Sequence, residues 1–441
     1  MKNGKMQRND NSFKKFYELD LDERLDFIQN ETKIKKKDLQ LLKDMPKNFS
    51  FNKINNMVEN AIGIIPIPLG IATNFVINGK KYLIPVSTEE PSVIAAASKA
   101  AKIAKMAGGF IAEADESIMI GQILLVARKR NHKDLFVSKK ERERVRKIIT
   151  DNKEELLKIA NLKSRTVVAK DIQVREILDE SINNMGYMII IELIVDTKDA
   201  MGANVINTMC ESIAPKIEKL SNGEVVLKIL SNYSVNRLAR CKATFPKEMI
   251  GGSEGVNRIL LAYAFAYSDT FRAVTHNKGI MNGIDALAIA TGQDFRALEA
   301  SIHAYAARDG KYRSLTKWYK SKDGDLIGEI EIPMAIGIIG GIISVHPIVK
   351  VVLKILDIKN VKELASIFAA IGLAQNFAAI RALANEGIQK GHMKLHARNI
   401  ALTAGAEENQ VNIIAERLIK EKNVSVSKAK EIIELLNSNR I

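Results

Sequence analysis

Cysteine is scarce in this chain, and metal-binding motifs are absent from it. The 441 residues include two cysteines, Cys210 and Cys241, and no CxxC pair, which excludes a disulfide framework and a cysteine-based zinc knuckle. The HExxH motif is absent too. His392 and His396 have the i, i+4 spacing of a metal pair, but no acidic or cysteine third ligand accompanies them. We therefore expect no metal, and we interpret the two cysteines as small buried hydrophobic residues.

Long apolar runs are also missing. The longest apolar stretch, residues 334–345, is too short and too rich in glycine to cross a bilayer. The opening sequence MKNGKMQRND lacks the apolar segment of a secretory signal. Hydrophobic residues make up 46% of the chain and charged residues 27%, which is the balance of an ordinary globular protein. These features predict a cytoplasmic protein with no membrane partner.

Glycine-rich phosphate loops do not occur. Neither GxGxxG nor GxxxxGK[ST] is present, so a dinucleotide would bind outside the usual doubly wound arrangement. The nearest substitute is DAMGAN at residues 199–204, between an apolar strand pattern and a helix pattern. Backbone N–H groups at such a helix start are able to cradle a pyrophosphate. The alternative is that Asp199 simply caps the helix while the glycine eases the turn.

Positive charge, in contrast, is abundant. The formal net charge is +15, and residues 128–147 hold ten basic side chains against three acidic ones. One interpretation is a solvated helix face. A second is a field that attracts phosphate-bearing cofactors, and a third is a binding surface for nucleic acid, which clustered Lys and Arg favour through counterion release.

The first third of the chain alternates helix and strand patterns. Residues 1–50 alternate charged and apolar positions, as in short amphipathic helices of a packing arm. Residues 72–85 predict two strands joined at Asn78-Gly79, a dipeptide suited to a tight hairpin. The small-residue run 92–107 predicts a helix, with Pro91 at its first position and Gly108-Gly109 at its end.

The pattern changes after residue 118. Apolar runs and helix patterns follow each other in the order β-α-β-α-β, with one helix from Lys139 to Leu162, which predicts a small inserted split-βαβ domain. Glycine-containing strands are expected at 329–345, and helical patterns without proline follow Pro347. The fold class is therefore α+β. We expect a large α-rich domain at 1–117 and 232–387, a small ferredoxin-like, non-Rossmann domain at 118–231, and a C-terminal helical unit at 388–441.

Residues 275–285 combine His, Asn, Lys and Asp with glycine and apolar residues. A lysine buried there would need carboxylate partners to keep its charge, and a retained charge would stabilise a developing oxyanion. The motif TGQD at 291–294 supplies a carboxylate. The alternative is a surface loop with Lys278 in water. His392 stands at the entry to the terminal helices, and a histidine is able to protonate a leaving group near neutral pH.

Together these motifs resemble one family, the class II 3-hydroxy-3-methylglutaryl-coenzyme A reductases. The similarity extends over roughly residues 15 to 435, and the motifs occur in the family's order. They are ENAIG from Glu59, EEPSVIAAAS from Glu89, DAMGAN from Asp199, HNKGIMNGID from His276, TGQD from Thr291, GLAQN from Gly372 and GIQKGHMKLHARN from Gly387.

The resemblance implies a four-electron reduction of hydroxymethylglutaryl-coenzyme A to mevalonate and coenzyme A by two nicotinamide hydrides, through a thiohemiacetal and mevaldehyde, without a metal. By motif position Lys278 would stabilise the oxyanion and Glu90 would donate a proton in the aldehyde step. Asp294 would link these two side chains, and His392 would protonate the departing thiolate.

The same resemblance implies the substrate contacts. Ser92 and Arg272 match positions that hold the free carboxylate of the substrate, and Asn282 matches a position near its hydroxyl group. Gln375 and Asn376 match the coenzyme A side.

The small domain would bind the cofactor through Asp199, Met201, Gly202, Asn204 and Asn232. Glu154 falls where an acidic residue of NADH-using relatives meets the adenosine ribose, and a carboxylate there repels a 2′-phosphate. The surrounding Lys and Arg act in the opposite direction, so NADH is favoured only slightly over NADPH. This chain departs from the family before the strand that begins near Asp171, where Arg165–Ala169 replaces a glycine triplet.

The family further implies a homodimer or higher homo-oligomer with the site at the interface, and terminal helices that close over it as a flap. Two enzymatic alternatives stay open, a reductase of another coenzyme A thioester and the same reaction run oxidatively to degrade mevalonate. The alternative from another class is a basic protein that binds nucleic acid through residues 128–147; the enzyme interpretation expects no nucleic-acid partner.

Overall fold

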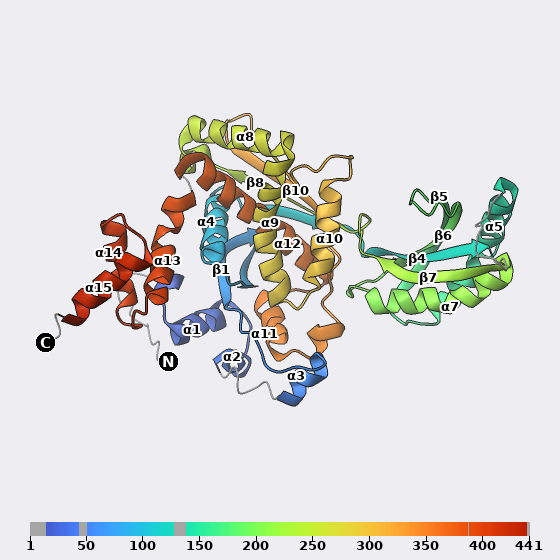
Figure 1. Ribbon diagram of the computed structural model, residues 1–441, viewed down its shortest axis with the longest axis horizontal. Coiled ribbons are helices and arrows are strands. Elements are labelled where there is room, and N and C mark those ends of the chain that lie inside the picture. Colours follow the sequence, from blue (N-terminus) through green and yellow to red (C-terminus); the bar gives the residue numbers. More distant parts are fainter. Residues whose placement is uncertain (1–14, 44–50, 128–137, 387, 439–441) are drawn as a thin grey trace, which may run out of the picture.

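The computed structural model describes residues 15–43, 51–127, 138–386 and 388–438. Its helices and strands form an α+β fold, as the sequence predicts. Figure 1 shows three parts along the longest axis: a large central unit with one sheet, a smaller unit with a second sheet on one side, and the C-terminal helices on the other.

The N-terminal helices pack against the central unit. Asp20 and Glu23 form a capping box that starts the first of them, because each side chain accepts a hydrogen bond from the other residue's backbone N–H. Ile28 and Leu39 bury their side chains against Val351 and Ile355. The elements concerned are α1 (Leu21–Glu31), α2 (Lys36–Lys43), α3 (Phe51–Met57) and α11 (Pro347–Leu356).

The central sheet has six strands in the order β2-β1-β3-β8-β10-β9. The predicted hairpin is confirmed, since Asn78 and Gly79 both have positive φ between β1 and β2. β1 and β3 are parallel, whereas the other neighbouring strands are antiparallel. The strands are β1 (Leu69–Ile77), β2 (Lys80–Ser87), β3 (Phe110–Ala114), β8 (Leu238–Phe245), β9 (Thr316–Lys320) and β10 (Leu326–Pro333).

Helices bury the apolar core against this sheet, with α12 at its centre (Figure 1). α12 and α9 approach closely where glycines face the partner helix: a Cβ on Gly283 would lie 3.1 Å from the carbonyl oxygen of Ile371. α12 is also apolar and long enough to cross a membrane, but 67% of its apolar window is buried inside the protein. The helices are α4 (Val93–Met106), α8 (Gly252–Ser268), α9 (Thr270–Ala290), α10 (Phe295–Ala306) and α12 (Val361–Arg381).

Two local expectations for the central unit are wrong, and one alternative is excluded. α4 begins at Val93, and Pro91 lies in the turn before it, because Ser92 has a positive φ of 80° that breaks the helix there. Residues 334–345 form no strand beyond Pro333, since successive glycines lead the chain into positive φ at Gly340 and a short 3-10 turn. Residues 275–285 lie inside the helix α9 and form no loop.

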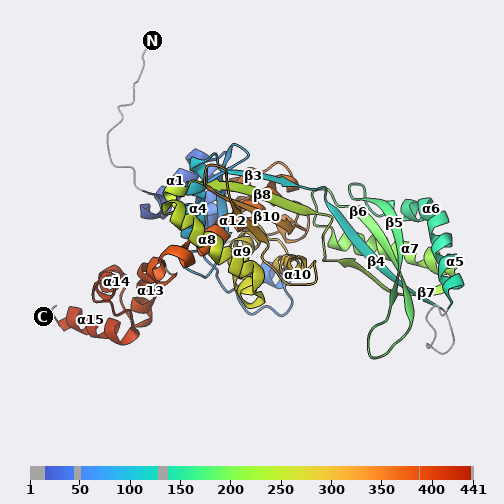
Figure 2. The same ribbon diagram turned by 90° about the horizontal axis from the view of Figure 1, so that it is seen from above.

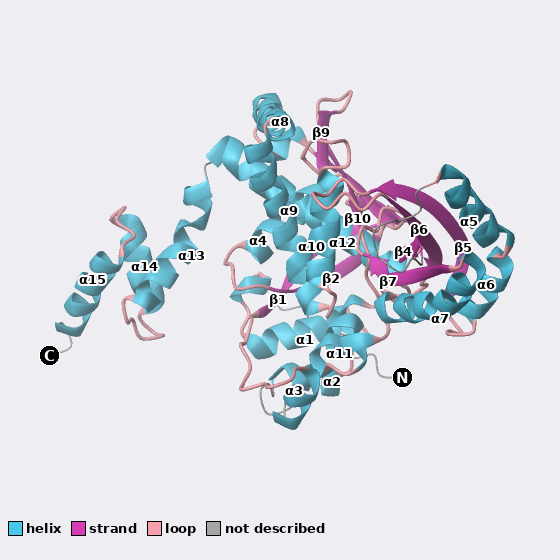
Figure 3. Cartoon of the chain, turned by 45° about the vertical axis from the view of Figure 1, so that its right-hand side comes forward, coloured by secondary structure: helices cyan, strands magenta, loops and turns pink. Residues whose placement is uncertain are grey.

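The second sheet has four antiparallel strands in the order β5-β6-β4-β7, with helices along one face (Figure 3). This is the expected ferredoxin-like arrangement with two corrections. The apolar pattern missed β5, whose charged residues lower its apolar content, and the expected single helix is broken at Asn152. The elements are β4 (Ile118–Ala127), α5 (Lys139–Asp151), α6 (Lys153–Asn161), β5 (Val168–Leu178), β6 (Tyr187–Asp196), α7 (Ala203–Ser221) and β7 (Gly223–Ser231).

The C-terminal helices have a core of their own. Ala397, Ile414, Leu418 and Ile432 bury their side chains among these helices. Figures 1 and 2 show them extending away from the central unit, at the end opposite the second sheet. They are α13 (Ile388–Thr403), α14 (Val411–Lys420) and α15 (Val426–Ser438). Closure of these helices as a flap remains a prediction.

Candidate active site

Lys278 and Glu90 form an ion pair. Lys278 lies on α9 and Glu90 in the turn before α4, and 3.0 Å separate Nζ from Oε2. The two side chains keep 62% and 41% of their exposure, so this lysine is not buried within one chain, contrary to the dry setting we considered. An ion pair this exposed contributes little by itself. Its influence on bound chemistry would grow once water is excluded.

Ser92 lies two residues after Glu90 in an uncommon conformation. Its φ is 80°, and its hydroxyl is buried without a hydrogen-bond partner. Positive φ at a residue with a side chain costs of the order of 1 kcal/mol or more, and such strain concentrates at ligand sites. A buried hydroxyl without a partner is also unfavourable until a ligand accepts a hydrogen bond from it or donates one to it. Both observations agree with the expected substrate contact.

Arg272 and Asn282 lie on the same helix as Lys278. Asn282 is one turn after Lys278 and therefore shares its face. Burial lowers the pKa of the Arg272 guanidinium, which nonetheless remains a cation at neutral pH. No ion pair between described residues involves Arg272, so its charge is available to an anionic ligand.

Asp294 caps the next helix and does not touch the Lys278–Glu90 pair in this chain. Its carboxylate accepts a hydrogen bond from the N–H of Ala297 at 3.1 Å and pairs with Arg296 at 3.2 Å. The link that we expect Asp294 to make between Lys278 and Glu90 remains a prediction.

Gln375 and Asn376 are neighbours on α12 with different environments. The side-chain oxygen of Gln375 is buried without a partner. The Asn376 oxygen accepts hydrogen bonds from Trp318 Nε1 at 2.9 Å and Thr316 Oγ1 at 3.0 Å, and its nitrogen lies 3.0 Å from His276 Nε2. Asn376 therefore joins α9, α12 and β9 inside the core, and its contact with coenzyme A remains a prediction.

His276 owes its place to the same cluster. Burial, with a smaller contribution from Arg272, lowers its pKa to about 3, so the imidazole stays neutral. His392 belongs to α13, and its side chain lies outside the described residues. Its role as an acid therefore remains a prediction.

The DAMGAN loop connects β6 to α7. Asp199 does not cap α7; its side chain accepts a hydrogen bond from the N–H of Val361 at 2.9 Å, which overturns the capping interpretation. Gly202 has a φ of 104°, and a Cβ there would lie 2.3 Å from Thr197 Cγ2. This position therefore requires glycine, and no side chain of the described residues caps the start of α7 by a hydrogen bond.

The other expected cofactor residues are distributed around the second sheet. Asn204 is exposed in the first turn of α7, Asn232 is exposed after β7, and Glu154 is exposed in the first turn of α6. Met201 is half-buried within the DAMGAN loop. Their contacts with a nucleotide remain predictions.

The basic cluster falls partly outside the described residues, at 128–137. In its described part, Lys139 pairs with Glu143 and Lys147 with Asp151 on exposed side chains, whereas Arg142 is buried and pairs with Glu176. These acidic partners favour the interpretation as a solvated helix face.

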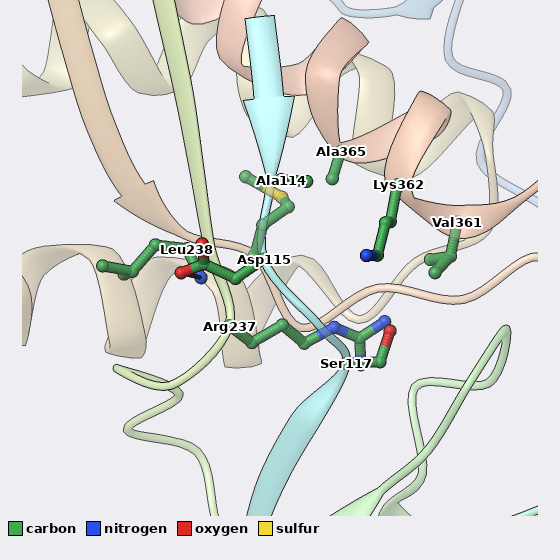
Figure 4. Close-up of a pocket in the computed structure, with 9 residues that line it drawn as sticks. Ala114, Asp115, Ser117, Arg237, Leu238, Val361, Lys362 and Ala365 are labelled. Carbon is green, nitrogen blue, oxygen red and sulfur yellow. Dashed lines mark hydrogen bonds between the residues drawn. The ribbon is translucent and has the colours of Figure 1, made fainter.

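Two further polar residues, Arg237 and Asp285, were assigned no role from the sequence. Arg237 is buried where the two sheets meet and lines a small pocket with Asp115, Ser117 and Val361 (Figure 4). Asp285, two turns after Lys278, has its pKa raised to about 8 by burial and by the neighbouring Glu299. Arg237 has no local sequence signal, because its partners come from distant segments, whereas Asp285 ends the HNKGIMNGID motif, which gave no indication of its pairing with Glu299.

Known proteins resemble this chain in sequence and in architecture. The family model for hydroxymethylglutaryl-coenzyme A reductase matches residues 20–397. The chain belongs to this family. The 3-hydroxy-3-methylglutaryl-coenzyme A reductase of Archaeoglobus fulgidus is 48% identical over 443 residues, covering 99% of this chain and 98% of the relative. A probable 3-hydroxy-3-methylglutaryl-coenzyme A reductase of Borreliella burgdorferi is 36% identical over 390 residues, covering 85% of each.

Solved structures from Streptococcus pneumoniae agree. One 3-hydroxy-3-methylglutaryl-coenzyme A reductase superimposes with a TM-score of 0.78 at 37% identity, covering 96% of this chain and all of that one. A class II enzyme described as bound to NADPH in open conformations gives 0.75 at 38% identity, covering 95% of this chain and all of that one. The family resemblance and the α+β fold are thus confirmed, and the chain is a member of a family of NAD(P)H-dependent oxidoreductases.

Proposed function

We propose that this chain reduces 3-hydroxy-3-methylglutaryl-coenzyme A to mevalonate and coenzyme A with two molecules of NAD(P)H. The proposal rests mainly on the 3.0 Å ion pair between Lys278 and Glu90. Ser92, two residues after Glu90, has a buried hydroxyl with no hydrogen-bond partner among the described residues. A cation and a carboxyl group side by side are able to stabilise an oxyanion and then deliver a proton to it.

The proposed roles follow the substrate through two reductions. Ser92 and Arg272 bind its free carboxylate, Asn282 lies near its hydroxyl group, and Gln375 faces coenzyme A. Nicotinamide nucleotide supplies one hydride to the thioester carbon and one to the aldehyde carbon.

Lys278 stabilises the carbonyl oxygen as it gains negative charge in each reduction. When the C–S bond of the thiohemiacetal breaks, His392 gives a proton to the thiolate. Glu90 protonates the aldehyde oxygen to yield the alcohol, and Asp294 sets the proton affinity of Glu90.

The start of α7 suits a dinucleotide phosphate. Gly202 has no room for a side chain, and the first N–H groups of a helix lack partners within it. We assign Asp199, Met201, Gly202, Asn204 and Asn232 to this cofactor. The preference between NADH and NADPH turns on Glu154, whose carboxylate favours NADH by repelling a 2′-phosphate.

We further propose a homodimer or higher homo-oligomer with the site at the interface. Ile62 in the ENAIG motif and Ile65 just after it expose 99% and 89% of their surface, and Phe271, next to Arg272, exposes 89%. Large apolar side chains in water favour a protein partner. A second copy would cover them and also exclude water from the Lys278–Glu90 pair.

The domain roles are part of this proposal. The domain at 1–117 and 232–387 binds substrate, the domain at 118–231 binds the nucleotide, and the unit at 388–441 closes over both. We place the protein in the cytoplasm, which the burial of α12 supports.

The test is to follow NADH and NADPH oxidation with hydroxymethylglutaryl-coenzyme A and with other acyl thioesters, in both directions. Rapid oxidation with this thioester and slow oxidation with the others is the expected result. A faster rate with another acyl group would contradict the proposed substrate, and a dominant reverse reaction would assign the chain to mevalonate degradation.

A further inference from the structure

The proposed nucleotide loop is held from behind by a buried arginine. Arg237 immediately precedes β8 and is 4% exposed. Its guanidinium donates hydrogen bonds to Thr197 Oγ1 at 3.1 Å, to the carbonyl of Ala200 at 3.3 Å and to the carbonyl of Ile336 at 2.5 Å. A fourth, longer bond reaches the carbonyl of Met201 at 3.5 Å.

This arginine stays charged although no carboxylate contacts it directly in the described residues. Burial lowers its pKa to about 10, and the more distant charges of Asp196 and Asp199 oppose that shift. A buried cation is stable only when its donors are satisfied, and here backbone carbonyls and one hydroxyl satisfy them. Arg237 is therefore tied to the backbone shape of residues 197–201 and not to an ion pair.

The hydrogen bonds from Arg237 to the loop carbonyls also determine where the neighbouring N–H groups point. A trans peptide places its carbonyl and the following N–H on opposite sides. Because the carbonyl of Met201 turns toward Arg237, the N–H of Gly202 turns away from it, at the start of α7. Arg237 thus orients the donor groups that we assign to the cofactor phosphate.

A glycine on the opposite segment closes the loop from a second direction. A Cβ on Gly337 would lie 2.6 Å from Met201 N and 3.1 Å from Ala200 C. The next residue, Ile338, donates its N–H to the carbonyl of Asp199 at 2.8 Å. Only glycine allows the two backbones to approach this closely.

Gln293 connects the same glycine to the proposed catalytic loop. Its Nε2 donates to the carbonyl of Gly337 at 2.8 Å, and its Oε1 accepts the Gly337 N–H at 2.9 Å. Asp294 follows directly in the chain. Residues 336–338 therefore touch the nucleotide loop on one side and the loop that carries Asp294 on the other.

We infer that Arg237 and Gly337 are positioning residues for the nicotinamide nucleotide: they fix the shape of the loop at 199–202 and, through Gln293, its place relative to Asp294. This inference rests on the proposed function, since it takes that loop as the cofactor site. In this role neither Arg237 nor Gly337 touches the substrate.

The experiment uses the full chain with Arg237→Lys and Gly337→Ala. Lysine keeps the charge but loses the planar fork that reaches several acceptors at once. Alanine removes no hydrogen bond but pushes a methyl group against Met201. The matched control is Arg240→Lys on β8, because Arg240 makes 2.7 Å ion pairs with Asp115 and Glu331 and its side-chain hydrogen bonds among the described residues go to these two residues, not to residues 197–202.

Nucleotide affinity is measured by fluorescence titration of NADH and NADPH without acyl thioester, and both KM values are measured in turnover. We expect both variants to weaken nucleotide binding about tenfold or more while KM for the thioester changes less than twofold. The control should leave both constants unchanged. Equal losses for nucleotide and thioester, or no loss in a folded variant, would overturn the inference.

Folding is checked by circular dichroism and thermal unfolding. If Arg237→Lys does not fold, Gly337→Ala carries the test, and Gln293→Glu adds a third variant that keeps the acceptor but replaces the donor. If the wild type binds nucleotide but does not turn over hydroxymethylglutaryl-coenzyme A, the proposed substrate fails, while the binding titrations still decide the roles of Arg237 and Gly337.

Discussion

The two halves of the candidate site are built differently. The Lys278–Glu90 pair stands in water on one chain, with side chains 62% and 41% exposed. The proposed nucleotide loop at 199–202 is fixed from inside, by an arginine that is 4% exposed and by a glycine with no room for a side chain. Residues 199–202, the proposed cofactor side, are thus held in place by contacts within the chain. The Lys278–Glu90 pair would lose its contact with water only when a ligand, a second copy or the terminal helices cover it.

This contrast has a consequence for mutations. Removing an exposed charge should change the chemistry and leave the fold intact, because little packing is lost. Changing a buried clamp should alter both the shape of the loop and the stability around it, because its hydrogen bonds would be left without partners.

The largest expected effect is that of Lys278→Ala. Both hydride transfers place negative charge on the oxygen that this cation faces, so we expect a loss of more than about a hundredfold in kcat for the thioester and for mevaldehyde. The melting temperature should stay near that of the wild type, because the side chain is exposed. A folded variant with nearly full activity would remove Lys278 from its assigned role.

His392→Gln should separate the two reductions. Only the thioester expels a thiolate, which can add back to the aldehyde unless it is protonated. Reduction of hydroxymethylglutaryl-coenzyme A should fall about a hundredfold, while mevaldehyde reduction falls far less. Both assays use one preparation, so misfolding would lower both rates equally. Equal losses in a folded variant would instead indicate that His392 orders the terminal helices.

The sequence predicted features that arise from local contacts, and it missed features that arise from contacts between distant segments. The hairpin at Asn78-Gly79 follows from local preferences, and the order of apolar runs indicated the split-βαβ domain. The glycines within residues 275–285 left a surface loop open as an alternative. These residues are helical, and Gly283 lets α9 approach the backbone of α12 closely. Such packing between distant segments leaves no periodic signal.

The site residues show the same division. Long motifs located Lys278 and Glu90 without any knowledge of their 3.0 Å contact. They did not reveal that Asn376 is engaged within the core, or that Arg237 bonds Ile336, 99 positions along the chain. Motif position identifies residues that relatives share, but only the packed structure shows which of their atoms are already engaged.

Asp285→Asn would examine a buried carboxyl group on the helix that carries Lys278. Asp285 is protonated at neutral pH in the folded protein because burial and then Glu299 raise its pKa to about 8. Glu299, held by His303 at 2.7 Å, has a lowered pKa. A folded-state pKa above the unfolded value means that the Asp285 contribution to stability is lost as pH rises from about 4 to about 8.

The amide resembles the protonated acid but does not titrate. The melting temperature of Asp285→Asn should therefore gain on that of the wild type as pH rises through this window, which thermal scans at several pH values would measure. Glu299 contributes with the opposite sign and also raises the pKa of Asp285, so Glu299→Gln is a second variant of the same pair and should narrow this pH window. Parallel curves for wild type and Asp285→Asn would show that this carboxyl group does not titrate as described.

The smallest expected effect is that of Glu154→Ala on nucleotide choice. Glu154 is exposed at the start of α6, so its repulsion of a 2′-phosphate is screened by water and salt. Removing it should raise kcat/KM for NADPH relative to NADH by only a few fold, and less at high ionic strength. Glu155→Ala is the control, because its carboxylate already pairs with Lys216 at 2.7 Å.

A wild type that strongly prefers NADPH would contradict this assignment before any mutation. An unchanged preference in Glu154→Ala, with the loop variants still losing affinity, would place nucleotide discrimination in the fixed loop at 199–202 and not in the surface charge.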